Sequence, residues 1–325
     1  MIKSVLGAGN ALVDILAIIP DHSLLEKYKL PVGSMQHVDE PTANRVYDEL
    51  KQFAPSVVSG GSAANAVRAM AELGMTAGFF GKVGHDELGD LYDKDLRAAG
   101  IHSLLKRDDA STGRAMVLVL PDAERTFAVH LGAAALMNPD DIPAEAFDDY
   151  DCLHIEGYLI QNHSLIETAM KCAKQKGKTV SLDLASYNVV EEHLDFLRGI
   201  VERYTDIVFA NEEEARAFAG VEPEKAVEIL GSLCDIAVVK LGARGSIVKH
   251  GDELHRLPAI PVTPVDLTGA GDLYAAGFFR ALSSGLDLAA CAKAGTVCAA
   301  EIIKLIGTKL PAEALSNVRA AIAKL

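Results

Sequence analysis

The chain has few basic residues relative to its acidic ones. Over 325 residues, 31 Lys and Arg stand against 45 Asp and Glu, which gives a formal net charge of −14. This balance does not suit a protein that binds the phosphate backbone of nucleic acid, so no nucleic-acid partner is expected. The five cysteines form no Cys-x-x-Cys pair, which favours reduced thiols in a cytosol. The ten histidines show no metal-ligand spacing, and no zinc site is predicted.

The sequence also lacks long apolar runs. No stretch approaches 18 consecutive apolar residues, and the first residues lack the apolar segment of a secretory signal. We therefore expect a soluble, cytoplasmic protein with no membrane partner. The length suits one large domain with a small addition. The sequence is compatible with either a monomer or a homodimer.

Short apolar runs that are typical of buried strands alternate with amphipathic helical stretches through most of the chain. This pattern predicts an α/β fold with a doubly wound, mainly parallel sheet flanked by helices. The expected strands are residues 5–9, 77–81, 152–155, 179–182, 207–210 and 236–240. The expected helices are residues 63–73, 87–99, 164–176, 191–202, 213–219, 273–282, 288–305 and 312–323.

Two segments, residues 12–38 and 111–133, interrupt this alternation. Within the second, residues 114–120 and 126–131 flank a turn at 121–124 and predict a β-hairpin. Short strands remote from the main alternation need a sheet of their own, so we expect a small second sheet. A surface hairpin without function is the alternative.

Residues 269–272 read Gly-Ala-Gly-Asp and open an apolar helical run. Small residues let a ligand approach the main chain, and the free amides of a helix N-terminus can hold an anion. A carboxylate beside a bound phosphate is useful if it accepts the proton of an attacking hydroxyl. Asp272 therefore points to phosphoryl transfer to an alcohol. The alternative is a plain helix cap, with Thr268 or Asp266 as the capping residue.

Two further motifs accompany this one. Residues 60–65 read Gly-Gly-Ser-Ala-Ala-Asn, and residues 211–214 read Asn-Glu-Glu-Glu. With residues 266–272 they resemble, in order and spacing, the signatures and the Asn-x-x-Glu element of the ribokinase-like PfkB family of carbohydrate and nucleoside kinases. The resemblance runs from Gly9 to about Gly307.

This resemblance implies a kinase that uses ATP and Mg²⁺ and phosphorylates a small molecule. It also implies that residues 1–325 form one kinase domain, with the inserted segments 12–38 and 111–133 as a small β lid over the substrate. Asp272 would be the general base, and the amides of Gly269, Ala270 and Gly271 would stabilise the transferred group.

The resemblance also implies further site residues, which are grouped by the ligand that each would contact. The substrate would contact Asp14, Gly60, Gly61 and Asn65. The nucleotide would contact Asn211, Lys240, Gly242, Thr268, Gly269 and Gly271. Glu214 would act on Mg²⁺ through water, and Asp266 could offer an oxygen to K⁺.

Plainer interpretations exist for several of these residues. Asp14 could be a turn residue that enters the small sheet. Asn211 could be an N-cap followed by an acidic first turn. Lys240 and Arg244 could be solvated charges.

Substrate choice rests on weaker patterns. Residues 9–15, 156–159 and 300–307 are similar to bacterial adenosine-kinase-like proteins and favour a nucleoside. Its base needs an apolar slot, for which the candidates are Met35, Phe127, Leu131 and Met137. The alternative is a kinase for ribose, fructose or a keto-deoxy acid. An acidic or phosphorylated sugar would need basic partners, for which the candidates are Arg114, Arg125 and Arg68. A non-catalytic sugar- or nucleotide-binding regulator is a third possibility, and Asp272 with its glycines argues against it.

Overall fold

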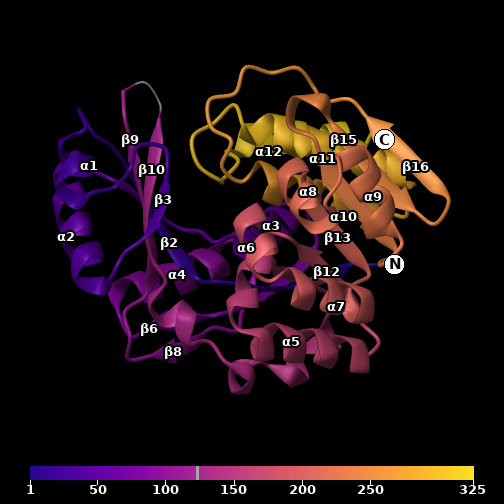
Figure 1. The fold of residues 1–325 in the computed structure, drawn as a ribbon, viewed down its shortest axis with the longest axis horizontal. Helices are drawn as coiled ribbons and strands as arrows, with labels where there is room; N and C mark the ends of the chain where they lie inside the picture. The colour runs from indigo at the N-terminus through magenta and orange to yellow at the C-terminus, as the bar shows by residue number, and fades with distance from the viewer. Residues whose placement is uncertain (122–123) are drawn as a thin grey trace.

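A nine-stranded sheet forms the centre of the molecule (Figure 1). The computed structural model describes residues 1–121 and 124–325. Across the sheet the order is β16 (Glu253–Leu257), β15 (Ser246–His250), β14 (Ile236–Lys240), β13 (Ile207–Asn211), β12 (Thr179–Asp183), β11 (Cys152–Glu156), β1 (Ser4–Ala8), β5 (Thr76–Phe80) and β7 (His102–Ser103). The strands from β14 to β7 pair in parallel, and the β15–β16 hairpin extends one edge in the antiparallel direction.

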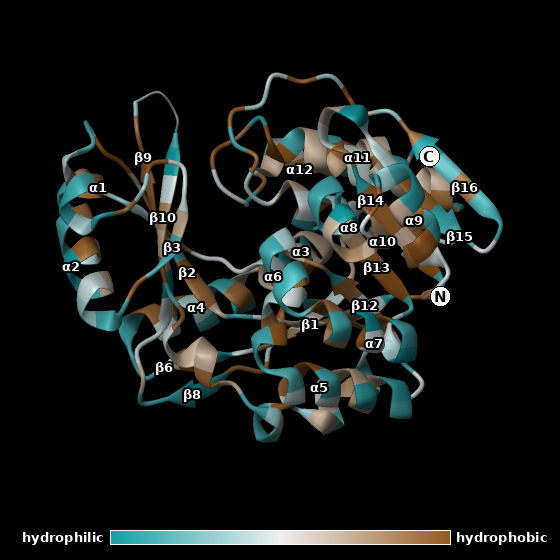
Figure 2. Cartoon of the chain, in the orientation of Figure 1, coloured by the Kyte–Doolittle hydropathy of each residue, from teal (hydrophilic) through white to brown (hydrophobic). Residues whose placement is uncertain are grey.

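Helices cover both faces of this sheet because its strands are apolar on both sides. In β13, Phe209 packs against Phe278 and Phe279, whereas Val208 and Ala210 belong to the core of the opposite face. The first face carries α3 (Ser62–Glu72), α4 (Glu87–Ala98), α10 (Ala270–Ser283), α11 (Leu288–Ile302) and α12 (Ala312–Ile322). The other carries α5 (His163–Gln175), α6 (Tyr187–Glu192), α7 (Leu194–Tyr204), α8 (Glu212–Ala219) and α9 (Pro223–Gly231). Hydrophilic residues line the outer sides of α5 and α7 (Figure 2). The predicted doubly wound α/β fold is confirmed.

A separate five-stranded sheet stands beside the large one (Figure 1). Its order is β3 (Met35–His37), β10 (Arg125–His130), β9 (Gly113–Val119), β2 (Leu12–Ile18) and β4 (Ser56–Ser59). The strand β4 lies outside the two inserted segments and pairs antiparallel with β2. Two helices, α1 (Ser23–Tyr28) and α2 (Glu40–Leu50), pack on the outer face of the small sheet. The predicted turn at 121–124 includes Asp122 and Ala123, which lie outside the described residues.

The predicted helix at 191–202 is divided in the structure. His193 leaves the helical conformation with φ of −119° and separates α6 from α7. Other elements were not predicted, among them α1, α2, α9 and a two-stranded sheet of β6 (Lys82–Gly84) and β8 (Lys106–Asp108). Short 3₁₀ helices cover Lys51–Phe53, Gly132–Leu136, Pro139–Asp141, Ala144–Asp149, Gly157–Gln161 and Gly242–Arg244. All five cysteines are free thiols. No helix in the described ranges has the length and apolarity that a membrane span needs.

Candidate active site

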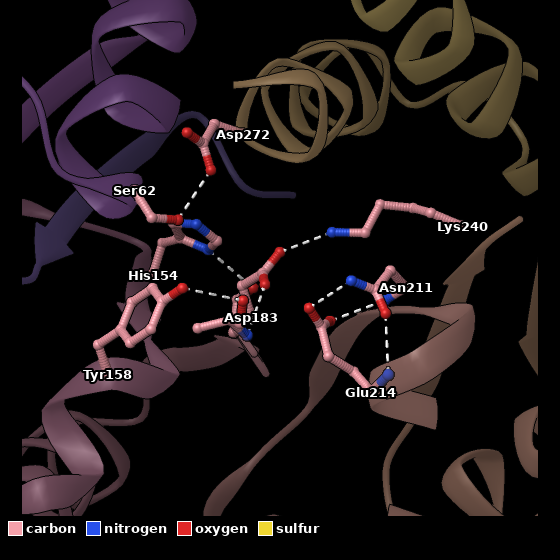
Figure 3. A network of polar contacts seen from close by, with 10 residues as sticks. Ser62, His154, Tyr158, Asp183, Asn211, Glu214, Lys240 and Asp272 are labelled. Atoms are coloured by element: carbon pink, nitrogen blue, oxygen red, sulfur yellow. Dashed lines mark hydrogen bonds and ion pairs between the residues drawn. The ribbon is translucent and has the colours of Figure 1, made fainter. Parts of the chain in front are cut away.

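Polar side chains gather where the parallel strands end. Asp183 ends β12, Asn211 ends β13 and Lys240 ends β14. The N-terminal turns of α3 and α10 meet at the same edge, because Ser62 contacts Asp272 there (Figure 3). In an open α/β sheet this edge is where ligands bind.

Asp272 is held by two side chains of α3. Ser62 Oγ donates to Oδ1 of Asp272 at 2.7 Å, and Asn65 Nδ2 donates to Oδ2 at 3.2 Å. Burial raises the pKa of the Asp272 carboxyl to about 6, and the negative charge of Asp183 adds to this effect. The two hydrogen bonds and the Lys240 ammonium oppose it. A carboxylate with a pKa near neutrality can accept a proton and release it again.

The loop before Asp272 exposes backbone amides. Gly269 has φ of +75°, a left-handed conformation that favours glycine. The Ala270 amide donates to the Leu267 carbonyl at 3.2 Å, so it is engaged and differs from the predicted free donor. Within the described part of the chain, the amides of Gly269, Gly271 and Asp272 meet no protein acceptor. These three amides are the donors left for an anion.

Gly60 and Gly61 bring the backbone close to Asp14. A Cβ at Gly60 would lie 2.1 Å from Oδ2 of Asp14, and a Cβ at Gly61 would lie 2.4 Å from the Asn10 carbonyl oxygen. Gly61 also has φ of +91°. The Gly60 carbonyl accepts a hydrogen bond from the Tyr92 hydroxyl at 2.9 Å. Any larger residue at Gly60 or Gly61 would therefore move Asp14 or the loop that precedes it.

Asp14 belongs to the same electrostatic cluster as Asp272. Burial raises the pKa of the Asp14 carboxyl to about 7. The positive charges of Arg68 and Lys309 lower this pKa, and the negative charge of Asp272 raises it. The structure thus brings a predicted substrate residue and the predicted base into one site.

On the other side of the loop, Lys240 is buried in an ion pair. Its Nζ lies 2.9 Å from Oδ2 of Asp183 (Figure 3), and a Cβ at Gly271 would lie 3.0 Å from the same Nζ. Burial lowers the pKa of the Lys240 ammonium, but Asp183 and Glu214 raise it by more. The ammonium therefore stays charged beside the amides, and it is not a solvated surface charge.

Asn211 and Glu214 cap the N-terminus of α8 reciprocally. Oδ1 of Asn211 accepts the Glu214 amide at 2.8 Å, and the Glu214 carboxylate accepts the amide and Nδ2 of Asn211 at 2.7 and 2.6 Å. Burial and the nearby Asp183 raise the pKa of the Glu214 carboxyl to about 7. The interpretation of Asn211 as an N-cap is therefore correct. Glu214 also lies near Asp183 and Lys240.

Gly242 and Arg244 lie in the exposed turn after β14. Gly242 has φ of +55°, and a Cβ there would meet no atom within 4 Å. Arg244 forms surface ion pairs with Glu212 and Glu224. For Arg244 the interpretation as a solvated charge is correct.

The Asp266 carboxylate already has several hydrogen-bond and ion-pair partners. Its two carboxylate oxygens accept the Thr268 amide at 2.8 Å and the Gly307 amide at 2.7 Å. Arg125 pairs with the same carboxylate and donates to Thr268 Oγ1 at 2.9 Å. The guanidinium supplies the positive charge that the predicted K⁺ would bring, and it would repel that ion. These residues therefore do not fit a K⁺ ion in the observed arrangement.

Each arginine considered for an acidic substrate already has a partner. Arg125 is committed to the ion pair described above. Arg114 lies on the outer face of the small sheet, where it donates to Asn44 Oδ1 at 2.8 Å. Arg68 is buried and donates to Ser59 Oγ. These contacts would compete with a negatively charged acceptor for the same guanidinium groups.

The inner face of the small sheet is mainly apolar around Asp14. The strand register places Asp14 in a row with Ala115 and Val129. The adjacent row on this face consists of Ser56, Leu16, Val117, Phe127 and Met35, four of which are apolar. Of the other residues considered for an apolar slot, Leu131 lies just beyond β10, and Met137 is buried in the core beneath the large sheet.

Several side chains in this cluster were not assigned a role from the sequence. Asp183 directly follows the predicted strand 179–182, so its place at a strand end was a usable signal. Glu156 ends β11, and its carboxylate accepts the amides of Asn10 and Ala63, each at 2.9 Å. Thr308 reaches the site from far along the chain, and no local pattern marks it.

Comparison with known proteins agrees with this geometry. Residues 31–315 match the family described as pfkB family carbohydrate kinase. Adenosine kinase 1 of Arabidopsis thaliana is 26% identical over an alignment that covers 94% of this chain and 95% of the relative.

Two solved bacterial structures are similar over the whole chain. A probable sugar kinase from Rhizobium etli CFN 42 superposes with a TM-score of 0.89 at 31% identity and covers 100% of both chains. The adenosine kinase from Sinorhizobium meliloti superposes with a TM-score of 0.88 at 33% identity, over 99% of this chain and 100% of that one. With Asp272 beside free helix amides and a family match over most of its length, the chain belongs to the pfkB family of carbohydrate kinases and is a kinase.

Proposed function

We propose that this kinase transfers the γ-phosphate of ATP to the primary hydroxyl of a nucleoside that resembles adenosine. The family uses ATP, typically with Mg²⁺. The proposal is supported by the side chains around Asp272, by the apolar inner face of the small sheet and by the similarity to adenosine kinases.

Asp272 acts as the general base. It accepts the proton of the attacking hydroxyl while Ser62 and Asn65 hold its carboxylate in place. A pKa of about 6 leaves the carboxylate largely ionised at neutral pH yet basic enough to take the proton. Protein contacts thus supply both the orientation and the basicity that this step needs.

The amides of Gly269, Gly271 and Asp272 stabilise negative charge on the transferred group. Lys240 adds a full positive charge beside Gly271. Its partner Asp183 keeps the ammonium in place before the nucleotide arrives. An anion that binds here competes with Asp183 for the same ammonium.

Mg²⁺ neutralises the phosphate charge when it is bound with ATP. Asp183 and Glu214 are the residues that would hold it, because burial and the neighbouring Asp183 carboxylate raise the pKa of Glu214, and a dication would relieve the repulsion between the two carboxylates. Among the residues with described positions, no three His, Cys, Asp or Glu side chains are grouped to hold a metal directly. This donor set suits an ion that keeps most of its waters.

Asp14 accepts hydrogen bonds from the sugar hydroxyls of the acceptor. The apolar row next to it, which includes Phe127 and Met35, offers a face for a nucleobase. Because Arg114, Arg125 and Arg68 are all engaged, a neutral acceptor suits the site better than a sugar acid or a sugar phosphate.

The observation that carries the proposal is the contact of Asp272 with Ser62 and Asn65 next to the free amides. The test is ATP consumption by the purified protein across purine nucleosides, pentoses, hexoses and sugar acids. We expect the highest kcat/KM with adenosine or a close purine nucleoside.

A kinase for a free sugar is the second candidate, supported by the similarity to the probable sugar kinase. In a sugar kinase, Asp272 would still be the base and Asp14 would still bind sugar hydroxyls. The apolar residues that include Phe127 and Met35 would not be needed, because a free sugar has no nucleobase. Higher kcat/KM for ribose, fructose or a sugar acid would replace the nucleoside proposal. Absence of ATP consumption with every acceptor would favour a non-catalytic regulator.

A further inference from the structure

The turn between α11 and α12 reaches two different parts of the site. The Gly307 amide donates to the Asp266 carboxylate at 2.7 Å, and the Thr308 hydroxyl donates to Oδ1 of Asn65 at 3.1 Å. Both Thr308 and Asn65 are buried, at 6% and 5% exposure. A hydrogen bond of this kind, shielded from water, is costly to leave unmade.

The hydroxyl of Thr308 holds the Asn65 amide in place beside Asp272. An amide has one acceptor end and one donor end. Thr308 and, at 3.5 Å, Nη1 of Arg68 donate to the acceptor end, so Nδ2 is left to donate to the Asp272 carboxylate at 3.2 Å. A reversed amide would set its oxygen against the carboxylate oxygen and its NH₂ group against the Arg68 guanidinium, which can only donate, whereas the Thr308 hydroxyl can pair with either end of the amide.

We propose that Thr308 is a positioning residue for phosphoryl transfer, because its hydroxyl anchors the Asn65 amide that holds the base Asp272. The inference rests on the proposed function, in which Asp272 accepts the proton of the attacking hydroxyl. Thr308 touches neither substrate nor nucleotide in this scheme and acts through Asn65 alone. The second N–H of the amide stays available to the acceptor.

Loss of the Asn65 hydrogen bond also changes the electrostatic balance around the base. The charged groups that influence Asp272 or are influenced by it are Asp14, Glu156, Asp183 and Lys240. The negative charge of Asp183 favours the protonated form of Asp272, and the Asn65 hydrogen bond opposes it. Without that bond, the acid limb of the kcat profile moves to higher pH.

Two substitutions separate the hydroxyl of Thr308 from its packing. A Cβ at Gly269 would lie 2.9 Å from Cγ2 of Thr308, so this methyl group packs tightly against the loop before the base. Thr308→Val keeps the branched shape and removes the hydroxyl. Thr308→Ser keeps the hydroxyl and removes the methyl group.

Thr296→Val is the matched control. Thr296 is also buried, and its hydroxyl donates to the Ala292 carbonyl at 2.9 Å within α11. Thr296→Val therefore shows the effect of losing a buried threonine hydroxyl that contacts no residue of the site. All variants are measured with the acceptor that the wild-type protein phosphorylates best, whichever that is.

We expect Thr308→Val to lower kcat about tenfold, the size of one lost hydrogen bond, and to shift the acid limb upward in pH. The KM for ATP should stay close to the wild-type value. Thr308→Ser and Thr296→Val should retain wild-type kcat and pH dependence.

The opposite pattern, with a wild-type Thr308→Val and an impaired Thr308→Ser, would show that packing matters and overturn the inference. Equal kcat for Thr308→Val and Thr296→Val, with no pH shift, would overturn it as well. Asp272→Asn distinguishes failure of the proposed base from failure of the proposed role of Thr308. Wild-type turnover in Asp272→Asn contradicts the proposed base, whereas an inactive Asp272→Asn with an unaffected Thr308→Val contradicts only the role of Thr308.

Discussion

Arg125 on the small sheet forms an ion pair with Asp266 in the loop that leads into α10. Arg125 is 15% exposed at its side chain and Asp266 only 1%, so water screens this pair weakly. The contact joins two parts of the chain that are 141 positions apart and ties the small sheet to the loop before Asp272. One guanidinium therefore holds the small sheet and this loop together.

The first prediction concerns this link. Arg125→Gln removes the charge and should loosen the small sheet, so that limited proteolysis within the β9–β10 hairpin becomes faster in the absence of ligands. Arg97→Gln, which removes a surface arginine paired with Asp93, is the control and should leave the rate unchanged. Equal cleavage rates for both variants would show that the ion pair does not hold the sheet.

The second prediction concerns the base. Asp272→Asn keeps the size of the side chain and removes its ability to accept a proton, so kcat should fall by about 10²-fold or more. ATP binding, measured by calorimetry without acceptor, should change little. Turnover at the wild-type rate would remove Asp272 from its role.

The third prediction concerns pH. Asp272 must lose its proton before it can accept another, and its pKa is raised by burial to about 6. Activity should therefore be low when the carboxyl is protonated and should rise as the pH increases through this value. The measurement is kcat from about pH 5 to about pH 8. The residual activity of Asp272→Asn should lack this limb, and an identical limb in that variant would assign it to another group.

The fourth prediction concerns Asp14. Asp14→Ala should cost about 1.5 to 3 kcal/mol in kcat/KM for the acceptor, because sugar hydroxyls would lose a charged partner. Gly60→Ala should have a similar effect, since its Cβ would lie 2.1 Å from the Asp14 carboxylate and displace it. Gly199→Ala, inside α7 and 3.4 Å from a flexible arginine tip, is the control and should be kinetically silent. Unchanged acceptor kinetics in both Asp14→Ala and Gly60→Ala would leave Asp14 as a turn residue.

The fold was predictable because its strands are apolar on both faces. Each predicted strand begins and ends within two residues of an observed strand. The alternation of apolar runs with amphipathic stretches can be read directly from the order of residues along the chain. The small sheet was harder to define. Its strand β4 is short and separated from β2 by two helices, and only its pairing with β2 reveals its place.

The site was predictable only where motifs are local. Gly60, Gly61 and Asp272 stand in short patterns with a physical reason, and the structure brings them together. The contact between Thr308 and Asn65 joins positions 243 residues apart, so no pattern along the chain could show it. The state of Lys240 was equally hidden, because its burial depends on Asp183 from a different strand.

The most direct test of the account is the identity of the product formed from adenosine. The wild-type protein is incubated with ATP, Mg²⁺ and adenosine, and the product is analysed by mass spectrometry and phosphorus NMR, with 5′-deoxyadenosine as the control acceptor. The account predicts phosphate on the 5′-hydroxyl of adenosine and no transfer to 5′-deoxyadenosine. Phosphate on a secondary hydroxyl, or transfer to free sugars with adenosine left unchanged, would contradict it.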